Sequence, residues 1–215
     1  VARMSGCAGQ RCMAASEMVG VGEIEHIIEK IVAEAKKVVP GQNLGAVINK
    51  ESKERIERYI DQAEKDGAKI LVDGRGAIVK GKENGTYVGP TVIDYVKPEM
   101  SVAKEEIFGP VISIMRTNTI DEALEIENAN PYGNAASVFT QNGGLARYII
   151  DHASAGMIGV NVGVPVPREP FSFGGWNESK FGVGDITGKS SVEFWTKLKK
   201  STTKWNPEAG VNWMS

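Results

Sequence analysis

The chain has 215 residues, of which 41% are hydrophobic and 24% are charged, a balance that is ordinary for a soluble globular protein. Its formal net charge of -2 provides no basic field for nucleic acid, and no apolar run approaches the roughly 20 residues that a membrane-spanning helix needs. Two cysteines and two histidines form neither a disulfide framework nor a complete zinc site. We therefore expect no metal, no nucleic-acid or membrane partner, and a reducing compartment: the cytoplasm, or the mitochondrial matrix in a eukaryote.

The first half of the chain predicts an alternation of strands and helices. Small apolar residues predict a strand over 14–21. Apolar residues at helical spacing then predict helices over 23–38 and 49–67, followed by a short strand over 69–72. The Gly-rich, charged stretch over 73–89 indicates a surface hairpin.

The second half continues this alternation. We predict strands over 111–116, 135–140 and 156–161, and helices over 121–129 and 143–153. Such an order indicates an α/β fold with a mostly parallel sheet covered by helices. A stretch rich in Pro, Gly and aromatic residues (165–188) lacks periodicity, which in a compact domain usually indicates a functional loop. Alternating side chains over 192–204 predict an extended end segment.

Gly9-Gln10-Arg11-Cys12 places a cysteine after a small, polar approach, as a nucleophile requires. Only the thiolate attacks, and Arg11 together with the N–H groups of the turn would favour that form. The alternative is a small buried hydrophobic residue, the commoner role of a lone cysteine and the one we expect for Cys7. A cysteine hydrolase would need a partner histidine, and neither His26 nor His152 has a suitable sequence context.

Two further motifs follow the cysteine. One is Glu105-Glu106-Ile107-Phe108-Gly109-Pro110, and the other combines Gly159-Val160-Asn161 with a downstream Phe-Gly-Gly loop and Ser179-Lys180-Phe181-Gly182. In this order, and over essentially the whole chain, the motifs resemble the aldehyde dehydrogenase superfamily. Two departures are visible: the usual Pro-Phe-Gly-Gly is expanded to Pro170-Phe171-Ser172-Phe173-Gly174-Gly175, and Phe181 precedes Gly182.

The resemblance implies a role for each of these side chains. Cys12 would be the nucleophile, Glu106 would bind the ribose hydroxyls on the nicotinamide side of NAD, and Phe108 would pack near the nicotinamide ring. A carboxylate can accept two hydroxyl hydrogen bonds and an aromatic face can flank a planar ring. Phe173 would line the aldehyde pocket. The alternatives are a solvated acidic pair before a strand and, for Phe173, a core phenylalanine in a long loop.

The resemblance also implies an incomplete enzyme, because the family reaches its nucleophile only after a long cofactor-binding half. We expect residues 1–191 to form the catalytic domain and residues 192–215 a C-terminal oligomerisation strand and tail. NAD would be bound mainly by the absent half, and the full-length protein would be a homo-oligomer, a dimer or a tetramer. We expect no meaningful dehydrogenase activity from this chain alone.

A narrower resemblance concerns the branch that acts on methylmalonate semialdehyde. It is carried by Gly-Gln-Arg-Cys-Met-Ala and by residues 164–167, 171–176 and 193–199. The branch passes its acyl group to coenzyme A. Arg11 fits such a substrate, because a guanidinium binds a carboxylate through two parallel hydrogen bonds. The alternatives are an aldehyde dehydrogenase with another substrate and water as acceptor, and a catalytically silent, self-associating module.

Overall fold

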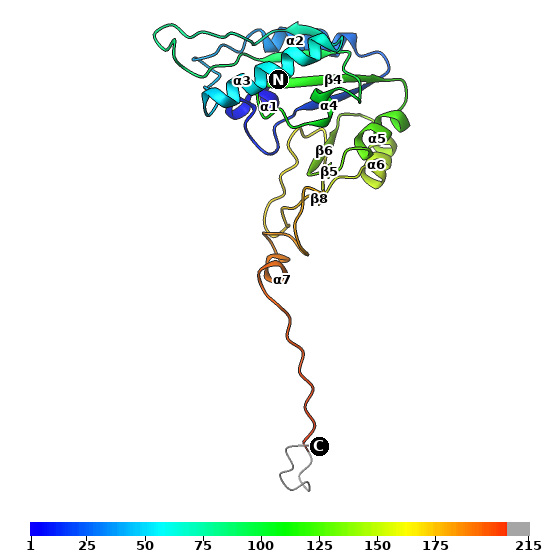
Figure 1. Ribbon diagram of the computed structural model, residues 1–215. Coiled ribbons are helices and arrows are strands. Elements are labelled where there is room, and N and C mark those ends of the chain that lie inside the picture. The colour runs from blue at the N-terminus through cyan, green and yellow to red at the C-terminus, as the bar shows by residue number, and fades with distance from the viewer. Residues whose placement is uncertain (206–215) are drawn as a thin grey trace.

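Four strands form the central sheet of the computed structural model, which describes residues 1–205 (Figure 1). Their order is β1 (Glu17–Val21), β4 (Val111–Thr117), β3 (Thr91–Asp94) and β2 (Lys69–Val72). Strand β4 runs parallel to both β1 and β3, and only β2 is antiparallel to its neighbour. The prediction of an α/β fold with a mostly parallel sheet is confirmed.

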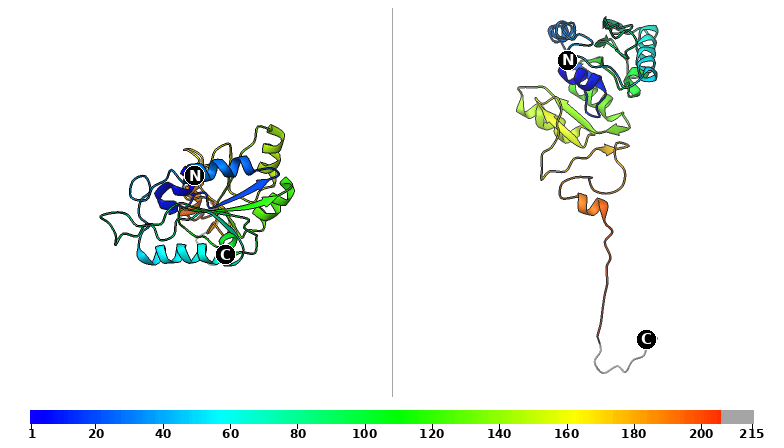
Figure 2. Two further views of the ribbon diagram at one scale, coloured as in Figure 1. Left: turned by 90° about the horizontal axis from the view of Figure 1, so that it is seen from above. Right: turned by 90° about the vertical axis from the view of Figure 1, so that its left-hand side faces the viewer.

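Helices cover both faces of this sheet, as the view from above shows (Figure 2). Helix α2 (Glu25–Ala35) packs on one face and helix α3 (Lys50–Lys65) on the other. Successive side chains of a strand point to opposite faces, so neighbouring residues of β3 and β4 enter different cores. Thus Ile93 and Met115 lie in the α3 core, whereas Val92 and Ile114 lie in the α2 core.

The chain then builds a smaller part around two short sheets. Helices α5 (Ile120–Asn128) and α6 (Gly143–His152) accompany the parallel pair β6 (Ala135–Val138) and β7 (Met157–Val160). The antiparallel pair is β5 (Tyr132–Gly133) and β8 (Trp176–Asn177). Strands β6 and β7, which the sequence predicts, therefore pair with each other and do not extend the central sheet.

Side-chain caps fix where the three longest predicted helices after residue 40 begin. The side chain of Asn49 accepts a hydrogen bond from Ser52 N–H at 2.8 Å at the start of α3. Thr119 and Glu122 form a capping box at the start of α5, and Asn142 caps α6. These caps place the helix starts within a residue or two of the predicted positions.

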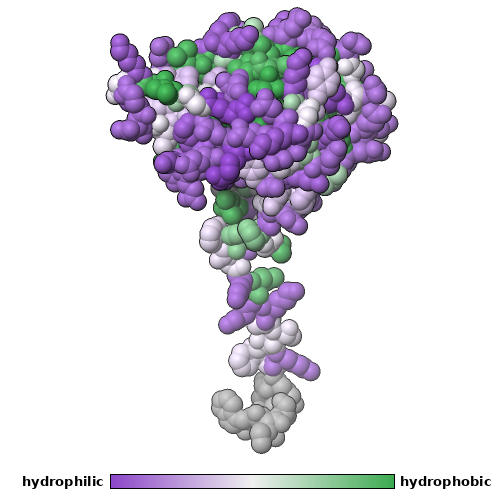
Figure 3. All heavy atoms as spheres, turned by 45° about the horizontal axis from the view of Figure 1, so that its top comes forward, coloured by the Kyte–Doolittle hydropathy of each residue, from purple (hydrophilic) through white to green (hydrophobic). Residues whose placement is uncertain are grey.

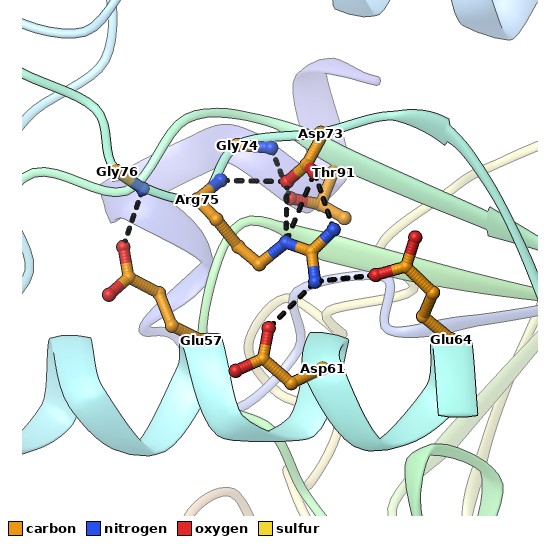
Figure 4. A network of polar contacts seen from close by, with 8 residues as sticks. All are labelled: Glu57, Asp61, Glu64, Asp73, Gly74, Arg75, Gly76 and Thr91. Atoms are coloured by element: carbon orange, nitrogen blue, oxygen red, sulfur yellow. Dashed lines mark hydrogen bonds and ion pairs between the residues drawn. The ribbon is translucent and has the colours of Figure 1, made fainter. Parts of the chain in front are cut away.

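The long loop between β2 and β3, residues 73–90, contains no strand of its own, so the hairpin is formed by its flanking strands. Arg75 fastens the loop to α3 (Figure 4). Its guanidinium lies 2.6 Å from an oxygen of Asp61, 2.8 Å from Glu64 and 2.6 Å from Asp73. The hydrogen bonding that Arg75 donates to the Asp73 carboxylate is the main cause that raises the pKa of Arg75. The strand that follows the loop, β3 (Thr91–Asp94), was not predicted from the sequence.

The C-terminal segment leaves the body and extends away from it (Figure 1). Residues Ser191–Trp195 form a short helix, α7, and residues 196–205 have no regular secondary structure. The prediction of an extended segment is therefore wrong for 192–195, where the chain completes a helical turn. The predicted boundary at residue 191 falls inside α7, and the last ten residues of the predicted tail, 206–215, lie outside the described part of the chain. Among the described residues, no helix is long and apolar enough to cross a membrane.

Candidate active site

The segment that carries Cys12 begins with a left-handed turn. After helix α1 (Ala2–Ser5), the 3-10 turn Gly6–Gly9 holds Cys7, Ala8 and Gly9 at φ values of 53°, 55° and 71°. Residues other than glycine seldom adopt this region, so Cys7 and Ala8 in succession form a costly local structure, whereas Gly9 adopts it freely. A second turn follows, in which Ala14 N–H donates a hydrogen bond to Arg11 O at 2.9 Å. Cys12 lies within this second turn and is exposed.

Gly9 presses this segment against the acidic motif. A Cβ atom at position 9 would lie 2.0 Å from the carbonyl oxygen of Gly109, and a Cβ at Gly109 would lie 2.7 Å from Ile56 Cδ1. The backbone of the cysteine segment, the backbone of the acidic motif and helix α3 are therefore stacked in direct contact. Only glycine at both positions permits this approach.

Helix α3 also holds the acidic residues from their other side. The motif follows the short helix α4 (Ser101–Lys104), and Arg55 donates a hydrogen bond to Glu106 O at 3.1 Å. The Tyr59 hydroxyl donates to the carboxylate of Glu105, and this hydrogen bond is the main cause that raises the pKa of Tyr59. Residue 108 adopts a left-handed φ of 53°, which turns the chain sharply after the acidic pair.

These contacts produce a cavity of about 60 Å³ between the two motifs. Its lining includes four of the residues that the sequence singled out: Arg11, Cys12, Glu106 and Phe108. The cavity is much smaller than the roughly 300 Å³ at the lower end of small-molecule sites. The described residues thus supply one wall of a site and do not enclose one.

Arg11 lies at the edge of this cavity with its side chain half-buried. Its guanidinium rests over Gly6, where a Cβ atom would lie 3.2 Å from Nη2. The Nε atom is enclosed and has no hydrogen-bond partner among residues 1–205. An unpaired donor of this kind is costly to bury, which marks Arg11 as a group suited to an added anion.

Phe173 does not line the cavity. It is half-buried in the loop after β7, where its N–H donates to Thr187 Oγ1 at 2.9 Å. The loop folds back on itself closely, because a Cβ at Gly174 would lie 2.0 Å from Asp185 Oδ1. Asn161, which directly follows β7, forms two hydrogen bonds with the backbone of Thr140: its side chain accepts from Thr140 N–H and donates to Thr140 O.

Two anchors of the cysteine segment were not expected from the sequence. The side chain of Asn134 donates to Cys12 O at 3.2 Å across a separation of 122 residues, and Gln10 accepts from Ile48 N–H at 2.8 Å. The Cys12 N–H donates no hydrogen bond to any residue in 1–205. For Gln10 the Gly-Gln-x-Cys motif was a usable signal, whereas nothing in the sequence links Asn134 to Cys12.

Comparison with known proteins places this arrangement in a family. The model of the aldehyde dehydrogenase family matches residues 1–201. The chain is 47% identical over 209 residues to the mitochondrial methylmalonate-semialdehyde/malonate-semialdehyde dehydrogenase [acylating] of Rattus norvegicus, covering 94% of this chain and 39% of the relative. It is 44% identical over 208 residues to malonate-semialdehyde dehydrogenase 2 of Geobacillus kaustophilus, covering 93% and 43%. The chain thus spans about two-fifths of the length of these relatives.

Solved structures agree with the sequence comparisons. A putative methylmalonate-semialdehyde dehydrogenase from Sinorhizobium meliloti 1021, complexed with NAD, superposes with a TM-score of 0.90 at 39% identity, over 98% of this chain and 44% of that one. The methylmalonate-semialdehyde dehydrogenase of Oceanimonas doudoroffii gives 0.90 at 40% identity, over 97% and 44%. The chain therefore belongs to the aldehyde dehydrogenase family.

Proposed function

We propose that this chain forms the catalytic half of an NAD-dependent, coenzyme A-acylating methylmalonate- or malonate-semialdehyde dehydrogenase. The observation that carries the proposal is the cavity that brings Arg11, Cys12, Glu106 and Phe108 together. In support, one relative above is named a methylmalonate-semialdehyde/malonate-semialdehyde dehydrogenase [acylating] and another a malonate-semialdehyde dehydrogenase, and their alignments cover 94% and 93% of this chain.

Cys12 would act first, as a thiolate that adds to the aldehyde carbon and forms a thiohemiacetal. The backbone N–H of Cys12 has no acceptor among the described residues. It would donate a hydrogen bond to the oxyanion that develops as the Cys12 thiolate attacks. Bound NAD would accept the hydride of the thiohemiacetal carbon, whose hydroxyl loses its proton, so that a thioester remains on Cys12. Glu106 would hold the nicotinamide ribose, and Phe108 would flank the ring.

Arg11 would select a substrate that carries a carboxylate beside its aldehyde. The side chain lies next to the nucleophile in sequence and in the cavity, and its buried Nε lacks a hydrogen-bond partner among residues 1–205. Malonate semialdehydes carry such a carboxylate. In the proposed reaction that carboxylate leaves as carbon dioxide and the carbon that carried it takes up a proton. The remaining acyl group then passes from Cys12 to the thiol of coenzyme A, which frees the Cys12 thiol and gives propionyl-CoA or acetyl-CoA. Phe173 is proposed as an aromatic side chain of the aldehyde pocket.

The rest of the enzyme would contribute most of the cofactor site. A cavity of about 60 Å³ does not hold an aldehyde and a dinucleotide together. We therefore propose that this chain alone has no meaningful dehydrogenase activity. We further propose a homo-oligomer joined in part by residues 192–215, and a location in the cytoplasm or, in a eukaryote, in the mitochondrial matrix.

A chimera tests the proposal directly. The N-terminal remainder of the Geobacillus kaustophilus relative is fused to this chain, and NADH formation is measured with malonate semialdehyde and coenzyme A. Cys12→Ser should reduce the rate to background, whereas Cys7→Ser, which removes the other exposed thiol, should retain activity. An inactive Cys7→Ser variant together with an active Cys12→Ser variant would refute the assignment of the nucleophile.

Arg11→Ala in the same chimera separates the proposed substrate class from other aldehydes. We expect kcat/KM for malonate semialdehyde to fall roughly 10- to 100-fold, the rate equivalent of about 1.5–3 kcal/mol for hydrogen bonds to a charged group. The value for propionaldehyde should change little. Equal losses for both aldehydes would favour a dehydrogenase of another substrate, and an inert Cys12 towards iodoacetamide would favour a silent module.

A further inference from the structure

The tip of the 73–90 loop carries an Asn84-Gly85 pair, in which Asn84 is exposed to solvent and Gly85 is half-buried. Residues 80–84 are all exposed, and the side chain of Asn84 makes no hydrogen bond within residues 1–205. Among residues 1–205 the tip is held by local contacts: Lys82 N–H donates to Val79 O at 2.9 Å, Gly85 N–H to Lys82 O at 2.8 Å, and Gly81 N–H to Glu83 Oε1 at 2.7 Å. Such exposed turn hydrogen bonds open at little free-energy cost.

Both arms of the loop are fixed, in contrast to the tip. Arg75, on the descending arm, forms ion pairs with Asp61 and Glu64 of helix α3 and with Asp73 (Figure 4). On the returning arm, Val47 N–H donates to Thr86 O at 2.9 Å and Lys53 Nζ donates to Tyr87 O at 2.9 Å. A change of backbone at residues 84–85 can therefore be absorbed by the tip without moving the sheet.

The structure requires glycine at position 85. A Cβ there would lie 2.4 Å from Cε2 of Tyr87 and 2.9 Å from Lys82 O, and Tyr87 is only 7% exposed. Replacement of Gly85 would push a buried ring out of place. This packing therefore keeps a glycine after Asn84. Because glycine has no side chain, its backbone nitrogen can attack the Asn84 side chain with the least steric hindrance.

We propose that Asn84 is a site of spontaneous deamidation. The nitrogen of Gly85, after losing its proton to hydroxide, forms a bond to Asn84 Cγ, and the Cγ–Nδ2 bond breaks to release ammonia. Water then opens the resulting succinimide at either carbonyl and gives aspartate or isoaspartate. The net change is one water consumed, one ammonia released and one negative charge added; asparagine is a recognised thermolabile residue. An isoaspartyl carboxyl at the exposed tip would be accessible to an enzyme that methylates this group.

The chain contains a matched internal control in Asn142-Gly143. Here Asn142 is the N-cap of α6: its Oδ1 accepts from Leu145 N–H at 3.1 Å, and its own N–H donates to Thr140 Oγ1 at 3.1 Å. A Cβ at Gly143 would meet nothing within 4 Å, so steric access is equal or better at this pair. The two pairs differ in their side chains, because that of Asn142 is held in place by the helix and that of Asn84 is not. They also differ in the backbone: Gly85 N–H donates to Lys82 O at 2.8 Å, and this turn hydrogen bond must open before the nitrogen can attack.

The experiment incubates the folded chain at 37 °C and several pH values, then maps both pairs by peptide mass spectrometry and an isoaspartyl methyltransferase assay. We expect modification at Asn84, faster in proportion to hydroxide, and little at Asn142. In urea both pairs should react at similar rates. Asn84→Gln should remove the modified peptide and the acidic charge variant while the fold is retained.

Two results would overturn the proposal. One is equal modification of Asn84 and Asn142 in the folded chain, which would show that helix capping is irrelevant. The other is an Asn84 that stays intact in the folded chain while the unfolded chain reacts, which would show that the turn protects it.

Discussion

At the scale of single residues, the candidate site depends on glycines as much as on reactive side chains. Gly9 combines a φ of 71° with a backbone approach that leaves 2.0 Å to Gly109 O for any added Cβ. Both the strained conformation and the overpacking oppose a side chain at this position. The distance between Cys12 and the acidic motif is therefore set by a residue with no chemistry of its own.

Gly9→Ala should lower the free energy of unfolding by about 3 kcal/mol or more, as expected when a left-handed alanine is forced against backbone. Urea denaturation of the isolated chain measures the change. Gly45→Ala is the matched control, because Gly45 has nothing within 4 Å of an added Cβ and no left-handed φ. Equal stabilities of the two variants would show that the contact with Gly109 can relax.

The sequence predicted which side chains meet at this cavity better than it predicted the residues that hold them in place. Cys12, Arg11, Glu106 and Phe108 lie in short motifs, and the structure brings all four to one cavity. Asn134 could not be predicted, since its contact with Cys12 O joins residues 122 positions apart in the sequence. Phe173 was predicted near the aldehyde, yet it lies outside the lining of this cavity, and its role stays a prediction.

At the scale of elements, helix α3 connects the core to the acidic motif. Its buried Ile56 and Ile60 pack on the sheet, while Arg55 and Tyr59, on a neighbouring face, reach the acidic pair. Helical spacing in the sequence predicted the first function of this helix and not the second, because a contact between distant polar side chains leaves no periodic signal.

Tyr59→Phe should therefore weaken cofactor binding in the chimera. Loss of the hydroxyl frees the Glu105 carboxylate, and we expect KM for NAD to rise about fivefold with kcat nearly unchanged, the equivalent of about 1 kcal/mol. Tyr148→Phe is the matched control, because Tyr148 also donates to a surface carboxylate, that of Asp121 at 2.8 Å, but Asp121 lies outside the acidic motif, whereas Glu105 directly precedes Glu106 of the cavity lining. A similar rise of KM in both variants would indicate a general loss of stability.

The two elements that the sequence misjudged, β3 and α7, are both short. Strand β3 has only four residues, Thr91–Asp94, all buried, and such a short run shows no alternation to read. In α7 the alternating apolar residues predicted a strand, but the turn is closed locally by Phe194 N–H on Ser190 O at 3.1 Å. Long amphipathic helices with caps were predicted well because periodicity and caps agree.

The junction of α5 and α6 should make stability depend on pH through Glu127. Burial raises the pKa of Glu127 above its ordinary 4.5, although its carboxylate accepts from Ser154 N–H at 2.9 Å. Between 4.5 and the higher folded value, the folded chain binds more protons than the unfolded chain, so the free energy of unfolding falls as pH rises through this window.

Glu127→Gln should reduce this decline without abolishing it, because burial also raises the pKa of Glu17, to about 7, and Glu17 is present in both variants. Urea denaturation between about pH 4 and about pH 7 measures the change in slope. Glu125→Gln, on the exposed side of the same helix, should leave the slope unchanged. Parallel curves for the original chain and Glu127→Gln would exclude Glu127 as the source of the slope.

At the scale of the whole molecule, large apolar side chains are exposed along the segment that extends from the body. Figure 3 shows polar atoms over most of the body, with apolar side chains continuing along the segment that extends from it. In that segment Trp195, Leu198 and Trp205 are 71%, 85% and 87% exposed. Lysines alternate with them, and an extended backbone with unpaired N–H and C=O groups is a ready template for another chain.

We expect the isolated chain to self-associate through this segment, and light scattering after size-exclusion chromatography measures the mass as concentration increases. Leu198→Lys should shift the protein towards monomer, because it replaces an exposed apolar side chain with a charge among Lys197, Lys199 and Lys200. Thr202→Lys adds the same charge to the same segment without removing apolar surface, so it should shift the equilibrium much less. If both variants associate as strongly as the original chain, the contact lies elsewhere, and the apolar surface of the body becomes the candidate.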